Sequence, residues 1–240
     1  MEELTRLNKA MAQTGFCSRR EADKYIEKGV VKINGKPVVL GDKVTASDEI
    51  SVNGKIITKE DEMVYLVFNK PIGITCTTDE NIKGNIISYL NYPKRIFPIG
   101  RLDKPSDGLI FLTNDGDIVN KILRARNHHE KEYMVTVDKP ITEEFVHKMQ
   151  AGVPILDTIT RPCKVVKIDE YTFTMILTQG LNRQIRKMCE FMGYDVLSLR
   201  RLRIMNIKLG NLKKGEYRNF TKDELKELNR MLADSSKTID

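Results

Sequence analysis

The chain has 240 residues, enough for one large domain or for a small and a medium one, and its 40% hydrophobic and 30% charged residues are typical of a globular protein. Its uncharged stretches are too short to span a bilayer, and its start lacks the order of a secretory signal, so we expect a cytoplasmic protein without a membrane segment. The net charge of +7 favours a polyanionic partner but does not identify one.

Residues 1–60 are expected to form a small module of two helices followed by a small sheet. Apolar residues recur at helical spacing in the first segment. Ser18, with Glu21 three residues later, forms a capping box that begins the second helix. Short β-prone runs follow, and Asn34-Gly35 between two of them predicts a hairpin.

A polar stretch over 58–63 marks a linker, so a second domain is expected over 64–240. β-prone runs predominate there. Helices are predicted over 117–124, 143–150 and 183–191, and from Thr221 to about 232. Because strands and helices do not alternate regularly, the expected fold class is α+β with a mixed, largely antiparallel sheet. No heptad run or large apolar face stands out, so a monomer is expected.

Asp103 is the first candidate for chemistry. It ends the stretch GRLD and precedes PSDG, which has the composition of a turn, so it is expected on a loop ahead of the apolar strand at 109–113. Loops held by a strand often carry catalytic groups. The structural alternative is that Asp103 pairs with Arg101 or accepts backbone N–H groups in the turn.

Two later stretches are further candidates. Tyr133, at the start of the strand EYMVTV, is either a core or rim residue or a platform for a nucleic-acid base. In GLNRQIRKM, residues 180–188, the apolar side chains are expected to face inward while Arg183 and Arg186 spread over other sides of a helix. An arginine facing Asp103 would keep its carboxylate ionised; binding phosphates alone is the alternative.

Basic residues are concentrated between Leu181 and Arg218, where ten lysines and arginines accompany three acidic residues. This excess of seven equals the net charge of the whole chain. It indicates either a surface for a polyanionic partner or an ordinary solvated basic face.

The cysteines and histidines form no motif for a metal. Four cysteines lie far apart without a CxxC pair, which predicts isolated buried thiols: Cys17, Cys76, Cys163 and Cys189. His129-Glu130 begins like a zinc-protease motif, but Tyr133 stands where the second histidine is needed. A GxxxxGK[ST] phosphate loop is also missing from the sequence, so we expect neither a metal nor a cofactor.

Together these stretches resemble a known family. GRLDKPSDGLIFLTNDGD resembles the catalytic motif of the RNA pseudouridine synthases, specifically of the ribosomal small-subunit pseudouridine synthase A family. The other motifs of this family are similar, in the same order, to FNKPIG, KEYMVTV and GLNRQIRKM. LNKAMAQTGFCSRREADKYIEKGVVKINGK resembles the alpha-L RNA-binding module of ribosomal small-subunit proteins and of these enzymes. GLNRQIRKMCEFMGYDV followed by RIMNIKLG is most similar to the large-subunit pseudouridine synthase F subgroup. Leu181 and Lys187 depart from the common family form, which bears on substrate choice more than on chemistry.

The resemblance implies an isomerase that converts uridine in RNA to pseudouridine without a cofactor. It makes Asp103 the nucleophile, Tyr133 the residue that stacks on the base and Arg186 the basic partner of Asp103. The implied substrate-binding residues are Arg101, which would help to extrude the nucleotide, and Lys70, Pro71, Asn182, Arg183 and Gln184.

The expected substrate is structured ribosomal RNA, and large-subunit (23S) RNA in particular. In the N-terminal module, the residues expected to contact RNA phosphates are Arg6, Lys9, Arg19, Arg20, Lys24, Lys32 and Lys36. Two alternatives stay open: the same reaction on a transfer RNA stem-loop, and a non-catalytic RNA-binding or ribosome-assembly protein that has kept the fold.

Overall fold

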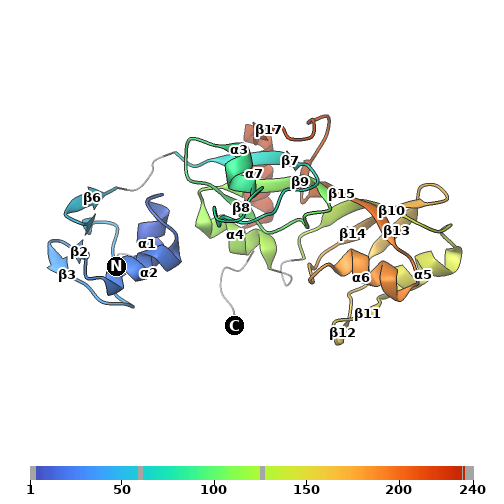
Figure 1. The fold of residues 1–240 in the computed structure, drawn as a ribbon, viewed down its shortest axis with the longest axis horizontal. Helices are drawn as coiled ribbons and strands as arrows, with labels where there is room; N and C mark the ends of the chain where they lie inside the picture. The colour runs from blue at the N-terminus through green and yellow to red at the C-terminus, as the bar shows by residue number, and fades with distance from the viewer. Residues whose placement is uncertain (1–3, 59–61, 125–127, 234, 236–240) are drawn as a thin grey trace. The chain divides into compact units, whose positions relative to one another are not determined.

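The computed structural model describes residues 4–58, 62–124, 128–233 and 235. Half of the predicted linker, residues 59–61, lies outside this part of the chain. Contacts divide the chain into two compact units, of which the first is Met1–Val64 with Tyr92–Ile96 and Asn114–Gly116, and the second is the remainder (Figure 1).

The first unit has two helices and then a small sheet, as the sequence predicts. Its elements are β1 (Thr5–Arg6), α1 (Leu7–Gln13), α2 (Arg19–Glu27), β2 (Val31–Ile33), β3 (Lys36–Pro37), β4 (Lys43–Val44), β5 (Ile50–Val52) and β6 (Lys55–Ile57). The sheet runs in the order β3-β2-β5-β6, and β1 pairs separately with β4. Leu7 and Met11 of α1 pack with Ile26 of α2 and Val31 of β2 in a common apolar core.

Local signals in this unit are confirmed. The Ser18 hydroxyl accepts the Glu21 N–H at 3.2 Å, and the Glu21 carboxylate accepts the Ser18 N–H at 2.6 Å, so both halves of the capping box are present. The Asn34-Gly35 turn joins β2 to β3 with both residues at positive φ, which Asn and Gly tolerate best. β3 is shorter than its apolar run because the Asp42 carboxylate accepts the Val39 N–H at 2.9 Å and turns the chain.

The second unit is built on one large sheet. Its elements are β7 (Tyr65–Lys70), α3 (Ile86–Leu90), β8 (Phe97–Ile99), β9 (Asp107–Thr113), α4 (Gly116–Leu123), β10 (Lys131–Val137), α5 (Glu143–Ala151), β11 (Pro154–Ile155), β12 (Thr158–Ile159), β13 (Lys164–Lys167), β14 (Thr172–Leu177), α6 (Gln184–Phe191), β15 (Val196–Ile204), β16 (Ile207–Lys208), β17 (Tyr217–Asn219) and α7 (Lys222–Met231). The strand order is β13-β14-β10-β15-β9-β7-β17, with β16 on β15 and β8 on β9.

This sheet confirms the expected α+β class. Among its described pairings β9 and β15 run parallel, and the others are antiparallel. The predicted helices at 117–124, 143–150 and beyond Thr221 form within one residue of their expected starts. No helix in the described part of the chain is both long and apolar enough to cross a membrane.

The parallel pair positions the centre of the unit. Gly108 of β9 lies opposite Arg201 of β15, with a φ of +107°. A Cβ atom on Gly108 would lie 2.4 Å from the Arg201 carbonyl oxygen, so only glycine allows the two strands to approach this closely. The loop that carries Asp103 leads directly into β9, and the close approach therefore places it beside β15.

Candidate active site

A cavity of about 350 Å³ opens in the second unit next to α6. The loop before β9, the start of β10, the middle of β15 and the segment at 179–186 form its walls. It brings together seven of the residues predicted from the sequence: Arg101, Asp103, Tyr133, Asn182, Arg183, Gln184 and Arg186. These positions are up to 85 residues apart in the sequence, and the β9–β15 pairing is what joins them.

Asp103 lies on a short loop whose backbone is well ordered by hydrogen bonds. Its carbonyl oxygen accepts the Ser106 N–H at 2.9 Å, which closes the turn predicted at PSDG. The side chain is 37% exposed, so its carboxylate is open to the cavity and to solvent. An aspartate in this position can reach a nucleotide that enters from outside.

Arg183 is the ion-pair partner of Asp103, because its Nη1 atom lies 4.0 Å from Oδ2 of the carboxylate. The sequence predicts Arg186 as the basic partner of Asp103; Arg186 also interacts electrostatically with this carboxylate, and its role as the partner stays a prediction. α6 begins at Gln184, one residue later than predicted, and Arg183 stands before it in the left-handed conformation with a φ of 50°. Arg183 therefore extends from the end of the helix and not from its side.

Arg186 instead holds the loop after Asp103. Its guanidinium donates to the Pro105 carbonyl at 3.3 Å and the Ser106 hydroxyl at 3.1 Å, and at 3.2 Å to the Val196 carbonyl at the start of β15. Burial lowers the pKa of Arg186, and the nearby Asp103 carboxylate opposes this effect. Arg186 thus fixes the loop, and its contact with substrate stays a prediction.

Tyr133 lines the cavity from β10 and is 8% exposed. In the strand register it lies opposite Arg201, whose guanidinium carbon is 6.0 Å from the centre of the Tyr133 ring. A buried, flat ring at a cavity wall suits stacking on a planar base.

Sequence reasoning missed two charged cavity residues, Lys131 and Arg201. Arg201 is 4% exposed and donates from Nε to the Leu109 carbonyl at 2.6 Å. Lys131 lies two residues before Tyr133, so both side chains leave the same face of β10. That alternation was visible in the sequence and could have identified Lys131; the burial of Arg201 depends on its pairing with β9 and was not visible.

Lys70 and Pro71 do not line this cavity. The Lys70 side chain is completely buried, and its ammonium group donates to the Pro71 carbonyl at 2.9 Å and the Ile74 carbonyl at 3.0 Å. Two of its three ammonium donors thus bind backbone carbonyls inside the protein, and its contact with substrate stays a prediction. Lys70 supports the turn that follows β7, and the burial of its ammonium group lowers its pKa.

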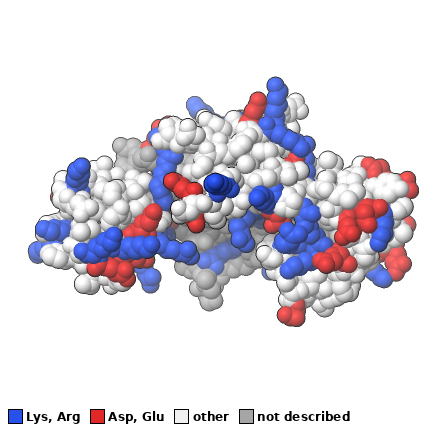
Figure 2. All heavy atoms as spheres, viewed as in Figure 1, with Lys and Arg blue, Asp and Glu red and all other residues white. Residues whose placement is uncertain are grey.

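The candidate RNA contacts of the N-terminal unit are mostly exposed. Lys and Arg side chains are prominent on its surface in Figure 2. The exposed candidates are Arg6, Arg19, Arg20, Lys24, Lys32 and Lys36, whereas Lys9 is half-buried. Their contact with RNA stays a prediction.

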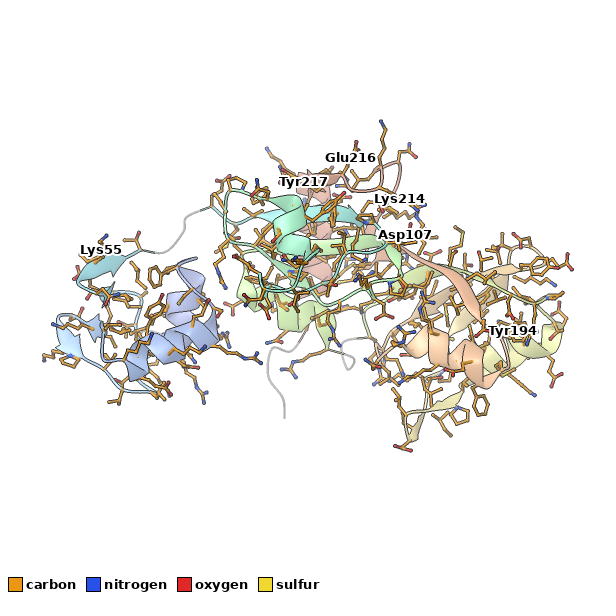
Figure 3. All side chains as sticks on the ribbon, in the orientation of Figure 1. Lys55, Asp107, Tyr194, Lys214, Glu216 and Tyr217 are labelled. Carbon is orange, nitrogen blue, oxygen red and sulfur yellow. The ribbon has the colours of Figure 1, made fainter. Side chains whose placement is uncertain are left out.

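The basic stretch from Leu181 to Arg218 is not one open positive face. Arg203 pairs with Glu130 at 2.9 Å and with Glu132 at 2.8 Å. The Lys214 ammonium lies 2.7 Å from the Asp107 carboxylate, and Figure 3 labels the two residues close to each other. Much of the charge excess in the sequence is therefore neutralised by acidic residues from other parts of the fold.

The cysteines are free thiols. Cys17, Cys76 and Cys189 are buried as expected, whereas Cys163 is half-buried. Burial raises the pKa of Cys189 to about 12, which keeps this thiol protonated and unreactive. Within the described residues, no three His, Cys, Asp or Glu side chains gather as a metal site would require.

Known proteins share this architecture. The family described as RNA pseudouridylate synthase matches residues 64–191, and the S4 domain matches residues 5–50. The dual-specificity RNA pseudouridine synthase RluF of Salmonella typhi is 56% identical over 234 residues, which cover 97% of this chain and 81% of that protein. The ribosomal large subunit pseudouridine synthase B of Bacillus subtilis (strain 168) is 37% identical over 243 residues, which cover 98% of this chain and 99% of the relative.

A solved structure agrees with the sequence matches. The "Crystal structure of pseudouridylate synthase" superimposes with a TM-score of 0.70 at 31% identity and covers 93% of this chain and 99% of that one. The resemblance given by the four motifs and the N-terminal module is thereby confirmed. The chain belongs to the RNA pseudouridine synthase family, whose members isomerise uridine in RNA, and carries an S4 domain before its catalytic domain.

Proposed function

We propose that this enzyme isomerises particular uridines in structured ribosomal RNA and that Asp103 is its nucleophile. The observation that carries this proposal is the position of the Asp103 carboxylate, which opens into the cavity 4.0 Å from the Arg183 guanidinium. The arginine places a positive charge between this carboxylate and approaching RNA phosphates, and an ionised carboxylate is the group the reaction needs.

The reaction joins carbon 5 of uracil to the sugar in place of nitrogen 1. It has no net redox change and needs no energy input, so one positioned carboxylate can carry it. The target uridine leaves its stack at a cost of a few kcal/mol. Stacking on Tyr133, worth about 1–3 kcal/mol for one base, offsets much of that cost.

The remaining cavity residues support binding in this proposal. Arg101 is exposed at the edge of the cavity, where it can help to extrude the nucleotide or fill the space it leaves. Asn182 and Arg183 are exposed before α6 and are available to the RNA backbone. Gln184 is buried and its side-chain oxygen accepts the Leu181 N–H at 3.1 Å, so it shapes the segment more than it contacts RNA.

Ribosomal RNA is favoured as substrate by the relatives and by the S4 domain. One relative is named as a ribosomal large-subunit pseudouridine synthase, and another is named as dual-specificity. The S4 domain supplies exposed cations that can position an RNA without reading its bases. The word dual-specificity keeps a second RNA, such as a transfer RNA stem-loop, as the alternative substrate.

A non-catalytic RNA-binding role is the less favoured alternative, because Asp103, Tyr133 and Arg186 are all present and all line one cavity. We further propose that the enzyme works as a monomer in the cytoplasm, where ribosomes are assembled. It uses no metal or other cofactor in this proposal.

The test is tritium release from RNA labelled at carbon 5 of uridine, because the reaction replaces that hydrogen. Wild type and Asp103→Asn are compared on unmodified large-subunit ribosomal RNA and on transfer RNA. Release from the ribosomal RNA that requires Asp103 supports the proposal. Release from transfer RNA alone would move the substrate to the alternative, and equal release by Asp103→Asn would remove Asp103 from the mechanism.

A further inference from the structure

Two cationic side chains line the deep part of the cavity, and we call Lys131 and Arg201 the cationic floor. Arg201 is 4% exposed, whereas the Asp103 side chain is 37% exposed, so the arginine lies deeper than the nucleophile. Both cations line the same cavity as Tyr133. A base that stacks on Tyr133 is therefore held next to the cationic floor.

Arg201 is fixed in place but not saturated. Its Nε donates to the Leu109 carbonyl at 2.6 Å, and its Nη1 donates to the Arg101 carbonyl at 3.4 Å. Its Nη2 is buried and has no hydrogen-bond partner among the described residues. A buried donor without a partner costs about 1–3 kcal/mol, so this group is suited to an acceptor that arrives with the substrate.

Lys131 is similarly uncompensated. Its ammonium donates to the His129 carbonyl at 3.3 Å and so uses one of its three donors. Among the described residues, no salt bridge joins Lys131 or Arg201 to a carboxylate. Arg203, two residues from Arg201 on the same strand, is paired with two glutamates. Arg203 of β15 thus has carboxylate partners, whereas Arg201 in the cavity has none among the described residues.

We propose that the cationic floor binds the uracil ring as an anion, from the moment its N1–C1′ bond breaks until its C5–C1′ bond forms. This inference rests on the proposed function, because it requires Asp103 to react at the sugar. The detached ring is flat, matches the Tyr133 face, and carries its charge over N1 and the two carbonyl oxygens.

Charge and atoms are conserved in the reaction that this proposal implies. An Asp103 oxygen bonds to C1′, and the electron pair of the N1–C1′ bond leaves with N1, so one negative charge passes from the aspartate to the ring. The ring turns until C5 faces C1′. Electrons of the ring then form the C5–C1′ bond and displace the carboxylate; C5 loses a proton and N1 gains one, so the product is an isomer of the substrate.

Fixed cations suit the rotation of the uracil ring because the two carbonyl oxygens of the ring share its negative charge. When the ring rotates, one oxygen replaces the other at the floor while Tyr133 keeps the plane of the ring. Preorganised charges in a cavity stabilise such a developing anion more than water does, because they do not have to reorient.

The charge of Lys131 can be tested through the pH dependence of the rate of tritium release, because the groups around Lys131 are known. The titratable and charged groups around it are Tyr133 on its own strand, Arg201 on β15, His129 before β10, and Arg101, Asp103, Arg183 and Arg186 in the cavity. Burial and the charge of Arg201 lower the pKa of Lys131 to about 8. The arginines stay charged, and burial lowers the pKa of His129, so neither changes charge between pH 7 and 9.

The experiment measures single-turnover tritium release from carbon-5-labelled ribosomal RNA with wild type, Lys131→Met, Lys131→Arg and Lys148→Met. Lys148 pairs with Glu144 on the surface of α5 and is the matched control. We expect Lys131→Met to release tritium on the order of 100-fold more slowly, as loss of one preorganised donor does. Its RNA dissociation constant should stay close to those of wild type and of Lys148→Met, and its unfolding midpoint at pH 7 should not fall below theirs, because the variant no longer buries a charge.

Lys131→Arg distinguishes a charge from a packing role. Wild-type release should fall above about pH 8, where Lys131 loses its proton, and Lys131→Arg should keep most of the rate and lack this fall, since arginine stays charged. A fall that comes from the RNA itself would be the same in every variant. An unchanged rate in Lys131→Met, or a pH profile that Lys131→Arg does not alter, would overturn the inference. Equal tritium release by wild type and Asp103→Asn would instead contradict the proposed function.

Discussion

The Arg183 guanidinium lies 4.0 Å from the Asp103 carboxylate, and Arg186, three residues further along, holds the loop that carries this aspartate. The two arginines thus have different tasks, although they come from one short basic stretch. Arg183 pairs with the Asp103 carboxylate, and Arg186 holds the loop that positions it.

These tasks predict different effects for Arg183→Gln and Arg186→Gln. Arg183 is 48% exposed, so its replacement should slow tritium release while the free energy of unfolding stays within about 0.5 kcal/mol of wild type. Arg186→Gln removes charged hydrogen bonds to three acceptors and should cost about 1.5–3 kcal/mol of stability as well as activity. Urea unfolding followed at equilibrium measures the difference. Equal stability of the two variants would show that the loop does not depend on Arg186.

Gly108→Ala is expected to be strongly destabilising. The new methyl group would lie 2.4 Å from the Arg201 carbonyl oxygen and 2.7 Å from its nitrogen, so β9 and β15 would have to separate. We expect a loss of more than about 3 kcal/mol and a loss of activity, since the same pairing forms the cavity. Gly54→Ala is the control, because it also has a positive φ but no atom within 4 Å of the new methyl group. It should cost about 1 kcal/mol. Similar costs for both variants in thermal unfolding would contradict the close-approach argument.

Much of the fold could be predicted because local chemistry determines it. The capping boxes of Ser18 with Glu21 and of Thr221 with Glu224, the Asn-Gly hairpin and the apolar strand after Asp103 each depend on residues a few positions apart. The position of Asp103 on a loop before β9 followed from turn composition in the same way. Such signals survive folding because tertiary contacts reinforce them.

The details of the site depended on contacts between distant segments. Three arginines lie within four residues of β15, and the sequence does not show that Arg201 is buried while Arg203 pairs with Glu130, just before β10, and Glu132, on β10. Lys70 is similar: a lysine beside a proline in a family motif suggested substrate, but the pairing of β7 with β9 buries it. The ion pair of Arg183 with Asp103 depends on where α6 begins, one residue later than predicted, which sequence patterns do not resolve.

Tyr133→Phe should keep RNA binding and retain most of the activity, because the proposed role of Tyr133 is to offer the face of its ring. Tyr133→Leu should bind the RNA less productively and lose on the order of 10- to 100-fold in single-turnover rate, the value of one stacked base. Loss of activity in Tyr133→Phe at unchanged binding would assign the hydroxyl a part in the chemistry.

The S4 domain is expected to bind RNA through phosphate contacts, and the salt dependence of binding tests this. Lys24 is exposed on α2, so Lys24→Gln should weaken binding of ribosomal RNA and reduce the slope of log affinity against log salt by about 1. Lys148→Gln, on the surface of α5, is the control and should leave the slope unchanged. An unchanged slope in Lys24→Gln would place the RNA on another face of the domain.

Lys131 also predicts how stability changes with pH, and the sign is opposite to that for activity. Its pKa is about 8 in the folded protein and near 10.5 when it is free, so the folded state disfavours the charged form. Below about pH 8 the wild type carries the whole cost of burying this charge. From about pH 8 to 10.5 the folded protein releases the proton before the unfolded chain does, and wild type gains stability relative to Lys131→Met. Urea unfolding of both proteins at several pH values across this range measures that gain, and Lys148→Met corrects for the general effect of alkali. A constant difference between wild type and Lys131→Met would mean that Lys131 is not buried as a cation, and the cationic floor would then consist of Arg201 alone.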